Sequence, residues 1–361
     1  MGAGLEAEEF MYNCCIEHIT IDFIIDNYIA GEFHNCKIYK LDEVENINNY
    51  FIVVACKLKE TYMQIKNLLV ERGLNEFENF IWFRMWNKKI VAINANCHGT
   101  ALKKYLTASD EFNLKYAIYP IPELQNNLLI EDNILKNVDV YIHQDIRVEN
   151  KVSYYLSDEF ILKKLKQNCL IICIPNFVGF GRMFFQTVNE GGYVANRQVL
   201  MFYRDNVIDQ CIEKNKECSL NELKDILNNL KINEEEICKK FNGYMIKIKE
   251  REKNWDIKVS EYIEENYKYY KLMNDIDHPS NVMMKYVCDQ VAEYLEIEPV
   301  TFNCFELGVE TFLQPKIKEA LGMDFEEKEV EKAQRFSNGK KKINYDDYLR
   351  QYVWLHENRI L

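Results

Sequence analysis

The sequence predicts an α/β protein with parallel sheets, because apolar strand-like runs alternate with amphipathic helices along the chain. The alternation occurs once up to about residue 86 and starts again at residue 90. A length of 361 residues favours more than one domain. The polar, basic gap Trp86-Asn87-Lys88-Lys89 separates the two runs. We therefore expect one domain over residues 1–86 and a second over 87–361.

The first domain is predicted to be a small Rossmann-like unit. Its expected elements are a helix to about Cys15, strands over 21–25 and 50–56, and an amphipathic helix over 60–72. Gly73 follows the second helix, and glycine at that position is a common helix stop.

Gly2, Gly4 and Ala7 have the GxGxxA spacing of dinucleotide-binding turns, and Asp26 stands where the ribose-binding acid is expected. Only Met1 precedes Gly2, so the strand that normally leads into such a turn is absent from the sequence. Either the fold begins one strand short or the natural chain starts earlier. Weak nucleotide binding, or none, is the expectation for this domain.

The second domain is predicted to contain a parallel sheet, a helical insertion over about 197–272 and a helical tail. A helix starting after Pro279 is expected over 281–295. The remaining expectations are strands at 90–94, 114–118, 138–143 and 169–175, a helix at 158–166, an irregular segment at 177–192, and a helical tail at 314–361 with one polar loop at 337–342.

Composition favours a cytoplasmic protein that acts on small molecules. The net charge of −12 disfavours nucleic acid and anionic membranes as partners. No apolar run has transmembrane length, and the acidic N-terminal stretch is unlike a signal peptide. The 12 cysteines lie in apolar segments without a CxxC motif, which indicates reduced thiols and no metal site.

Cys97 is the candidate nucleophile. It lies in Asn96-Cys97-His98-Gly99, between an apolar strand-like run and a helix-like stretch. A thiol at a helix N-terminus has its thiolate favoured by the helix dipole and by free N–H groups. The alternative is a small core residue, which is the commoner role of a lone cysteine.

His278 is the candidate base, in the segment Asp275-Ile276-Asp277-His278-Pro279. Asp275 is the preferred orienting acid, although Asp277 could serve instead. His98 is a second candidate base beside the thiol, but neighbouring side chains in a turn often point apart. The alternative is that these acids only form a turn.

Other polar residues follow the predicted strands. Gln144 and Asn176 each stand where a side-chain amide could stabilise an oxyanion, or could simply face water. Gly179, Gly181 and Arg182 could line a phosphate or pantetheine path, or form a surface turn. The run 340–342 is three lysines and is expected to be a solvated loop, with a polyanionic cofactor as the less favoured partner.

From about residue 88 to the end, the chain resembles the WcbI-type polysaccharide-biosynthesis family. The resemblance depends on the order and spacing of several short motifs. These are Asn96-Cys97-His98-Gly99 after a strand, the strand ending in Gln144, Ile174-Pro175-Asn176-Phe177 with Gly179, Trp255-Asp256-Ile257 before Tyr262-Ile263, and His278-Pro279-Ser280.

The resemblance implies a three-layer SGNH/flavodoxin-like fold and coenzyme A or acetyl-CoA as cofactor. It places Cys97 at the SGNH serine, Gln144 at the oxyanion-hole asparagine, and Asp275 with His278 in the acid–base block. No counterpart of the SGNH oxyanion glycine is identified. The cofactor-binding residues expected on this basis are Asn96, His98, Gly99, Asn176, Phe177, Gly179 and Arg182.

Together with the candidate thiol and imidazole, the resemblance implies an acyltransferase that moves an acetyl group from acetyl-CoA to a sugar hydroxyl, in capsule or other surface-polysaccharide assembly. The catalytic residues expected are Cys97, His278, Asp275 and Gln144. Direct transfer, with Cys97 only lining the pocket, is a variant of this mechanism. The alternatives are an SGNH-like carbohydrate esterase and a non-catalytic module that binds a nucleotide or a sugar.

Overall fold

The computed structural model describes residues 2–121, 128–146, 154–194, 202–215, 219–302, 305, 310–334 and 339–357. The chain divides into two compact units, each assembled from two segments. The first unit comprises 1–95 and 110–171, and the second comprises 96–109 and 172–361. The predicted domain boundary after residue 86 stays a prediction.

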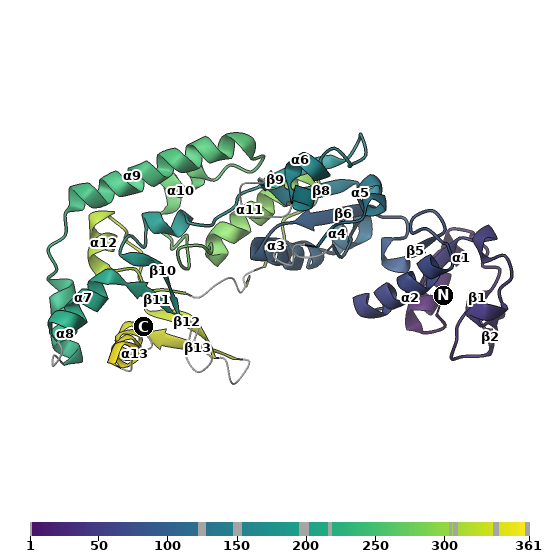
Figure 1. Cartoon of the computed structure of the whole chain (residues 1–361), viewed down its shortest axis with the longest axis horizontal. Helices are drawn as coiled ribbons and strands as arrows, with labels where there is room; N and C mark the ends of the chain where they lie inside the picture. Colours follow the sequence, from purple (N-terminus) through teal and green to yellow (C-terminus); the bar gives the residue numbers. More distant parts are fainter. Residues whose placement is uncertain are drawn as a thin grey trace. The chain divides into compact units, whose positions relative to one another are not determined.

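The N-terminal part of the first unit contains two small sheets (Figure 1). In one, β1 pairs in parallel with β3, and β3 pairs antiparallel with β2; in the other, β4 pairs in parallel with β5. The hairpin of β2 and β3 and the strand β5 were not among the predicted elements. The elements are α1 (Leu5–Ile16), β1 (Ile24–Ile25), β2 (Gly31–Phe33), β3 (Cys36–Tyr39), β4 (Ile52–Val54), α2 (Lys59–Glu71) and β5 (Phe80–Trp82).

A four-stranded sheet follows, in the order β7-β6-β8-β9, with β6 parallel to both β7 and β8. All five residues of β8 are buried, as expected for a parallel strand covered on both faces. The predicted α/β class with parallel strands is confirmed. The elements are β6 (Lys89–Asn94), α4 (Asp110–Lys115), β7 (Tyr116–Ile118), α5 (Asp132–Asn137), β8 (Val140–Gln144), α6 (Asp158–Ile161) and β9 (Leu170–Ile174), where the chain passes into the second unit.

The first unit contains a buried ion pair. Lys66 of α2 lies 2.8 Å from the carboxylate of Glu76, and both side chains are at most 5% exposed. The hydroxyl groups of Tyr62 and Tyr119 donate to the same carboxylate. Burial, followed by the charge of Glu76, raises the pKa of both tyrosines. Both phenols therefore remain protonated donors, and the carboxylate of Glu76 has three polar partners: Lys66, Tyr62 and Tyr119.

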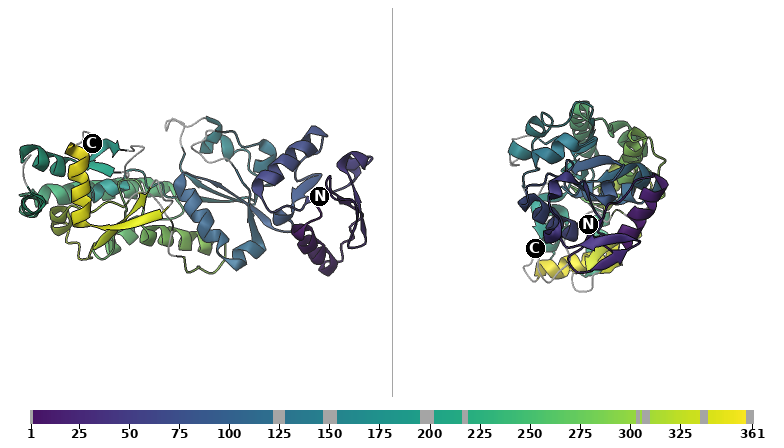
Figure 2. Two further views of the ribbon diagram at one scale, coloured as in Figure 1. Left: turned by 90° about the horizontal axis from the view of Figure 1, so that it is seen from below. Right: turned by 90° about the vertical axis from the view of Figure 1, so that its right-hand side faces the viewer.

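The second unit is mainly helical and includes two hairpins, β10–β11 and β12–β13. The second hairpin lies beside α13 (Figures 1 and 2). The elements are α3 (Cys97–Thr107), η7 (Phe180–Met183), β10 (Val188–Val194), β11 (Phe202–Asp205), α7 (Asn206–Lys214), α8 (Leu220–Asn228), α9 (Glu234–Arg251), α10 (Ser260–Asn266), α11 (Asn281–Tyr294), α12 (Pro315–Ala320), β12 (Glu329–Gln334), β13 (Gly339–Asn344) and α13 (Tyr345–Glu357).

Four predictions about this unit were wrong in part. The segment 177–192, expected to be irregular, contains most of β10, and the insertion expected to be helical includes β11. The tail, expected to be helical, contains the β12–β13 hairpin, and the lysines at 340–342 lie on β13 rather than in a loop. Val330 and Ile343 face each other across this hairpin and are buried against α13. This apolar burial stabilises the hairpin despite the highly charged sequence of its two strands.

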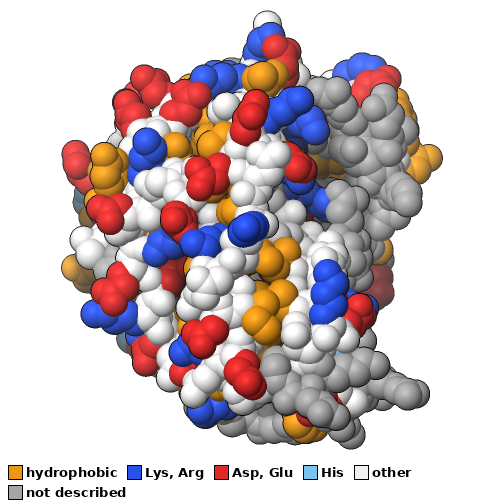
Figure 3. Space-filling view, turned by 90° about the vertical axis from the view of Figure 1, so that its left-hand side faces the viewer, with side chains coloured by type: hydrophobic (Ala, Val, Ile, Leu, Met, Phe, Trp, Pro, Cys, Tyr) orange, Lys and Arg blue, Asp and Glu red, His pale blue; other side chains and the backbone are white. Residues whose placement is uncertain are grey.

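Charge is mixed on the face of the second unit that Figure 3 shows, where acidic and basic side chains are interspersed. Among the residues that the structure describes, no helix has both the length and the apolar character needed to cross a membrane.

Candidate active site

Cys97 is the first residue of α3, as the sequence predicts. Asn96 caps this helix, since its side-chain oxygen accepts the N–H of His98 at 3.0 Å. The Cys97 sulfur lies 4.0 Å from the same oxygen, and the thiol is partly exposed. One of the N–H groups expected to be free at this terminus is therefore taken by Asn96.

His278 and Asp275 lie on a tight loop in the same unit. The loop is closed by the N–H of Asn274, which donates to the His278 carbonyl at 2.8 Å. The Asp275 carboxylate is 1% exposed and lies 2.9 Å from Nδ1 of His278. It also accepts the backbone N–H groups of Asp277 and His278, at 2.8 and 2.9 Å. Asp275 is thus held rigidly, and its carboxylate fixes the orientation of the imidazole.

The structure brings Cys97 and His278 together. Burial lowers the pKa of His278, but side-chain hydrogen bonds to Asp275 and Cys97, with the negative charges of both, outweigh burial and raise the pKa to about 10. Because Asp275 holds Nδ1, Nε2 is the nitrogen left for the thiol. At neutral pH the imidazole is therefore protonated, and it faces the sulfur with a positive charge.

His98, the second candidate base, has a different environment. It is 1% exposed, and its ring packs edge-on against Phe177 at 5.5 Å and His278 at 6.2 Å. Burial and the charge of His278 lower the pKa of His98 to about 3, against a smaller opposing effect of a hydrogen bond to the Asp277 backbone. The ring is neutral at physiological pH, so it serves as packing beside the charged His278.

The second candidate acid, Asp277, contacts a different loop. Its carboxylate accepts the N–H of Gly179 at 2.8 Å, and Gly179 has the left-handed backbone conformation, with φ +80°. Gly181 donates its N–H to the Ile276 carbonyl at 3.0 Å. Two hydrogen bonds therefore hold the loop after β9 against the loop that carries His278.

The residues expected to bind a cofactor fall into two groups. His98, Gly99 and Phe177 are buried, whereas Asn96, Asn176, Gly179 and Arg182 are at least partly exposed. The side-chain oxygen of Asn176 accepts the N–H of Val178 at 3.2 Å, so it stabilises its own turn. Binding of a cofactor by these residues stays a prediction.

Gln144 is buried at the end of β8 and belongs to the first unit. The neighbouring His143 lies 2.9 Å from Asp158. The oxyanion roles expected of Gln144 and Asn176 stay predictions.

Sequence reasoning missed Arg251, at the end of α9. Its guanidinium group donates to the Asn176 carbonyl at 3.0 Å and stacks over the rings of Phe180 and Trp255. The next residue, Asp256, bonds to the backbone of Cys173 at 2.6 Å, which ties the Trp255-Asp256-Ile257 motif to β9. Arginine near predicted aromatic residues was the available signal, but the pairing depends on tertiary contacts.

A surface pocket of about 380 Å³ lies between α9 and the segment that begins with η7. Three cations line it: Arg182, Lys240 and Lys247. Gly243, in the middle of α9, also lines it, and a Cβ at that position would meet no atom within 4 Å. The missing side chain widens the pocket, at a cost to helix stability of about 0.5–1 kcal/mol relative to alanine.

Taken together, these features define an α/β protein with a cysteine at a helix N-terminus. A histidine side chain contacts the cysteine sulfur, and an aspartate carboxylate is hydrogen-bonded to the histidine ring. Across the described ranges, no group of three or more His, Cys, Asp or Glu side chains is placed to hold a metal ion. The chain belongs to the family of the polysaccharide biosynthesis enzyme WcbI, whose sequence model matches residues 90–300. The predicted family is confirmed.

A solved structure of WcbI, a polysaccharide biosynthesis enzyme, has a similar fold. The TM-score is 0.56 at 18% sequence identity, over 75% of this chain and 90% of that chain. That structure is described as the native protein without a disulfide bond between coenzyme A and a cysteine. No curated protein sequence matches this chain.

Proposed function

We propose that this chain is an acetyltransferase that uses acetyl-CoA to acylate a sugar hydroxyl during polysaccharide biosynthesis. The observation that carries the proposal is the arrangement of Cys97, His278 and Asp275 at the N-terminus of α3. Membership of a polysaccharide-biosynthesis family supports the pathway, and the coenzyme A named for the related structure supports the donor. An SGNH-like arrangement of the site belongs to the same proposal.

In the first step, the Cys97 sulfur attacks the acetyl carbonyl carbon of acetyl-CoA. A new carbon–sulfur bond forms, the bond to the coenzyme A sulfur breaks, and the departing thiolate takes a proton from His278. A resting state with protonated His278 provides this proton, and the positive charge favours the attacking thiolate. One thioester replaces another, so the step is energetically mild.

In the second step, neutral His278 accepts the proton of the sugar hydroxyl as its oxygen attacks the acetyl carbon. The bond to Cys97 breaks, the sulfur leaves as a thiolate, and His278 is again protonated. Asp275 holds the ring through Nδ1 in both steps, so Nε2 performs both proton transfers. Gln144 is proposed to donate to the carbonyl oxygen in both steps.

The basic pocket of Arg182, Lys240 and Lys247 is the proposed site for the phosphate groups of the donor. Arg182, which lines this pocket, lies close to Gly179, since a Cβ at Gly179 would be 3.6 Å from the Arg182 Nε. Gly179 is in turn bonded to Asp277, next to His278. Cationic side chains converging on a pocket favour a polyanionic ligand, even on a protein of net charge −12.

Calorimetry with coenzyme A tests the donor assignment. Lys247→Ala should weaken coenzyme A binding about tenfold, which corresponds to about 1.4 kcal/mol, and should leave binding of pantetheine, which has no phosphate, unchanged. Lys239→Ala is the matched control, since Lys239 is an exposed lysine of α9 that does not line the pocket. Equal losses in both variants, or no coenzyme A binding at millimolar concentration, would contradict the donor site.

Product analysis separates transfer from hydrolysis. A transferase consumes acetyl-CoA in proportion to the acetylated sugar that it forms. An esterase instead releases acetate from an acetylated sugar in the absence of coenzyme A. A binding module would do neither and would keep its affinity in Cys97→Ala.

A further inference from the structure

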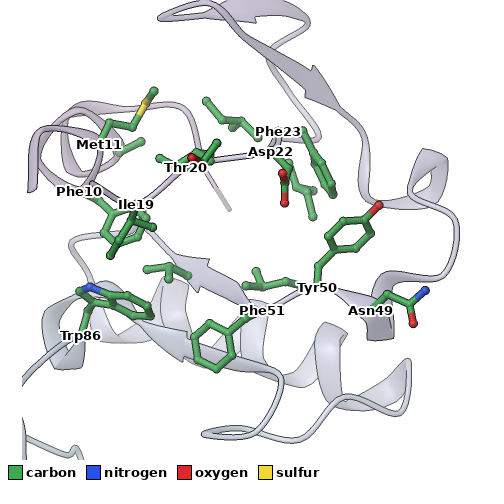
Figure 4. A pocket seen from close by; sticks show the side chains of 18 residues that line it. Phe10, Met11, Ile19, Thr20, Asp22, Phe23, Asn49, Tyr50, Phe51 and Trp86 are labelled. Atoms are coloured by element: carbon green, nitrogen blue, oxygen red, sulfur yellow. The ribbon is translucent and has the colours of Figure 1, made fainter. Parts of the chain in front are cut away.

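Two of the described features take no part in the proposed reaction. One is an apolar pocket of about 340 Å³ in the N-terminal part of the first unit, lined by several aromatic side chains such as Trp86 (Figure 4). The other is the ion pair of Lys271 with Glu327 in the second unit. Only the ion pair belongs to the unit that carries Cys97 and His278.

The backbone that leads into the His278 loop is bonded on two sides. On one side, the Leu272 carbonyl accepts the N–H of Ser280 at 2.9 Å, and the Asn274 N–H donates to the His278 carbonyl at 2.8 Å. On the other side, the Asn274 carbonyl accepts the N–H of Thr311 at 2.8 Å. The backbone of Asn274 therefore connects the candidate base with the later segment that begins at Thr311.

The ion pair is bonded to both ends of the segment 311–313. Nζ of Lys271 lies 2.6 Å from one carboxylate oxygen of Glu327, and the two side chains are 17% and 10% exposed. The same ammonium group donates to the Thr311 carbonyl at 2.7 Å. The other carboxylate oxygen of Glu327 accepts the N–H of Leu313 at 3.1 Å. The pair therefore holds the segment that is bonded to the entry of the His278 loop.

Two charges withdrawn from water are costly unless each has further polar partners. Here those partners are backbone groups of the segment 311–313, at its first and last residues. An apolar pair of the same volume could fill the space, but it could not bond to the backbone at two points. The contacts therefore indicate that Lys271 and Glu327 fix where this segment lies, in addition to filling the interior.

We infer that Lys271 and Glu327 are positioning residues for the reacting pair Cys97 and His278. The ion pair holds the segment 311–313 against the backbone that closes the His278 loop, and so keeps the imidazole beside the sulfur. Loss of the pair frees one side of that loop, although no atom of the pair touches the reacting groups. The inference rests on the proposed function in one respect, since it takes Cys97 and His278 as the reacting pair.

The pH dependence of Cys97 alkylation by iodoacetamide, followed by peptide mapping, tests the inference without any substrate. Lys271→Met should move the midpoint pH of this alkylation upward by about one unit, because a displaced imidazolium favours the thiolate less. Lys66→Met is the matched control, since it makes the same substitution in the buried pair of Lys66 with Glu76, in the first unit. The control should lower the melting temperature and leave the midpoint unchanged.

The double variant Lys271→Met with Glu327→Gln separates positioning from stability, and it is informative even where the single variant does not fold. It leaves the net charge unchanged and no buried charge without a partner, so most of the loss in melting temperature should be recovered. The bond to the Thr311 carbonyl is still missing, so the midpoint should stay raised. A midpoint that is unchanged in Lys271→Met, that rises equally in Lys66→Met, or that returns to the wild-type value in the double variant would overturn the inference.

Failure of the proposed function gives a different result. A wild-type Cys97 that is alkylated with the same midpoint as the exposed Cys15 would contradict the arrangement of Cys97 and His278 itself. A wild-type midpoint below that of Cys15, shared by both Lys271 variants, would contradict only the role of the ion pair.

Discussion

The backbone of Gly181 lies directly against the backbone of Asp275. A Cβ at position 181 would overlap the Asp275 carbonyl oxygen and lie 2.6 Å from the Ile276 Cα. Since backbone atoms cannot rotate away, a side chain at 181 has to displace the segment 275–276. That segment carries the Asp275 carboxylate, which orients the His278 ring. The position of the imidazole therefore depends on the absence of a side chain at Gly181.

Gly181→Ala should therefore reduce the reactivity of Cys97 without touching the thiol. We expect alkylation of Cys97 by iodoacetamide at pH 7 to slow, with a stability loss of about 1–3 kcal/mol from overpacking. Gly243→Ala is the matched control, because a Cβ there meets no atom. It should leave alkylation unchanged and stabilise α9 by about 0.5–1 kcal/mol. Unchanged alkylation in Gly181→Ala would argue against this close approach.

His278→Gln should slow alkylation of Cys97 at pH 7 more than Asp275→Asn does, because the charged imidazole contacts the sulfur whereas Asp275 acts through the ring. In transferase assays, the double variant Cys97→Ala with His278→Gln should be little worse than Cys97→Ala, as expected for groups that act as a unit. Peptide mapping separates the 12 cysteines, and the exposed Cys15 provides an internal reference thiol. Multiplicative losses in the double variant would show that the two residues act independently.

Stability should depend on pH through His278. Its pKa in the folded protein is raised to about 10, above the ordinary value of about 6.5. Its contribution is therefore fully present below about pH 6.5 and is lost as the pH rises through 10. In urea unfolding, the difference in unfolding free energy between the wild type and His278→Gln should be larger at pH 6.5 than at pH 10. A difference that stays constant over this range would show that the imidazole carries no such charge.

Lys66→Met should destabilise the first unit by about 3–5 kcal/mol, because it leaves Glu76 buried without its cation. Lys163→Met is the control, since the pair of Lys163 with Glu159 is exposed and 3.5 Å long. That change should cost less than about 1 kcal/mol. The urea concentrations at the unfolding midpoints of the two variants are compared. Equal midpoints would show that loss of the buried pair costs no more than loss of the exposed pair.

Local patterns predicted the α/β class, because strand-like runs such as 90–94 and caps such as Ser280 before α11 depend on neighbouring residues. They failed for β12 and β13, whose charged sequences form a hairpin because Val330 and Ile343 bury against α13. Sequence alone also left open whether Asp275 or Asp277 faces His278. The answer depends on Gly179, nearly a hundred residues upstream, which takes the Asp277 carboxylate.

The same limit applies to Arg251 and Gly181. Each acts through a contact with a distant segment, namely the Asn176 carbonyl and the backbone at 275–276. Periodicity and motif spacing carry no information on such contacts. They could single out Cys97 and His278 as candidates, because residue type, turn context and helix start are all local properties.

Mass spectrometry of the intact protein, after rapid acid quenching of a mixture with acetyl-CoA, tests the central claim most directly. The account predicts one acetyl group per chain, mapped to the peptide that contains Cys97, absent in Cys97→Ala and lost when the sugar acceptor is added. Acetylation that persists in Cys97→Ala, or transfer to the acceptor with no acetyl group ever detected on Cys97, would contradict it.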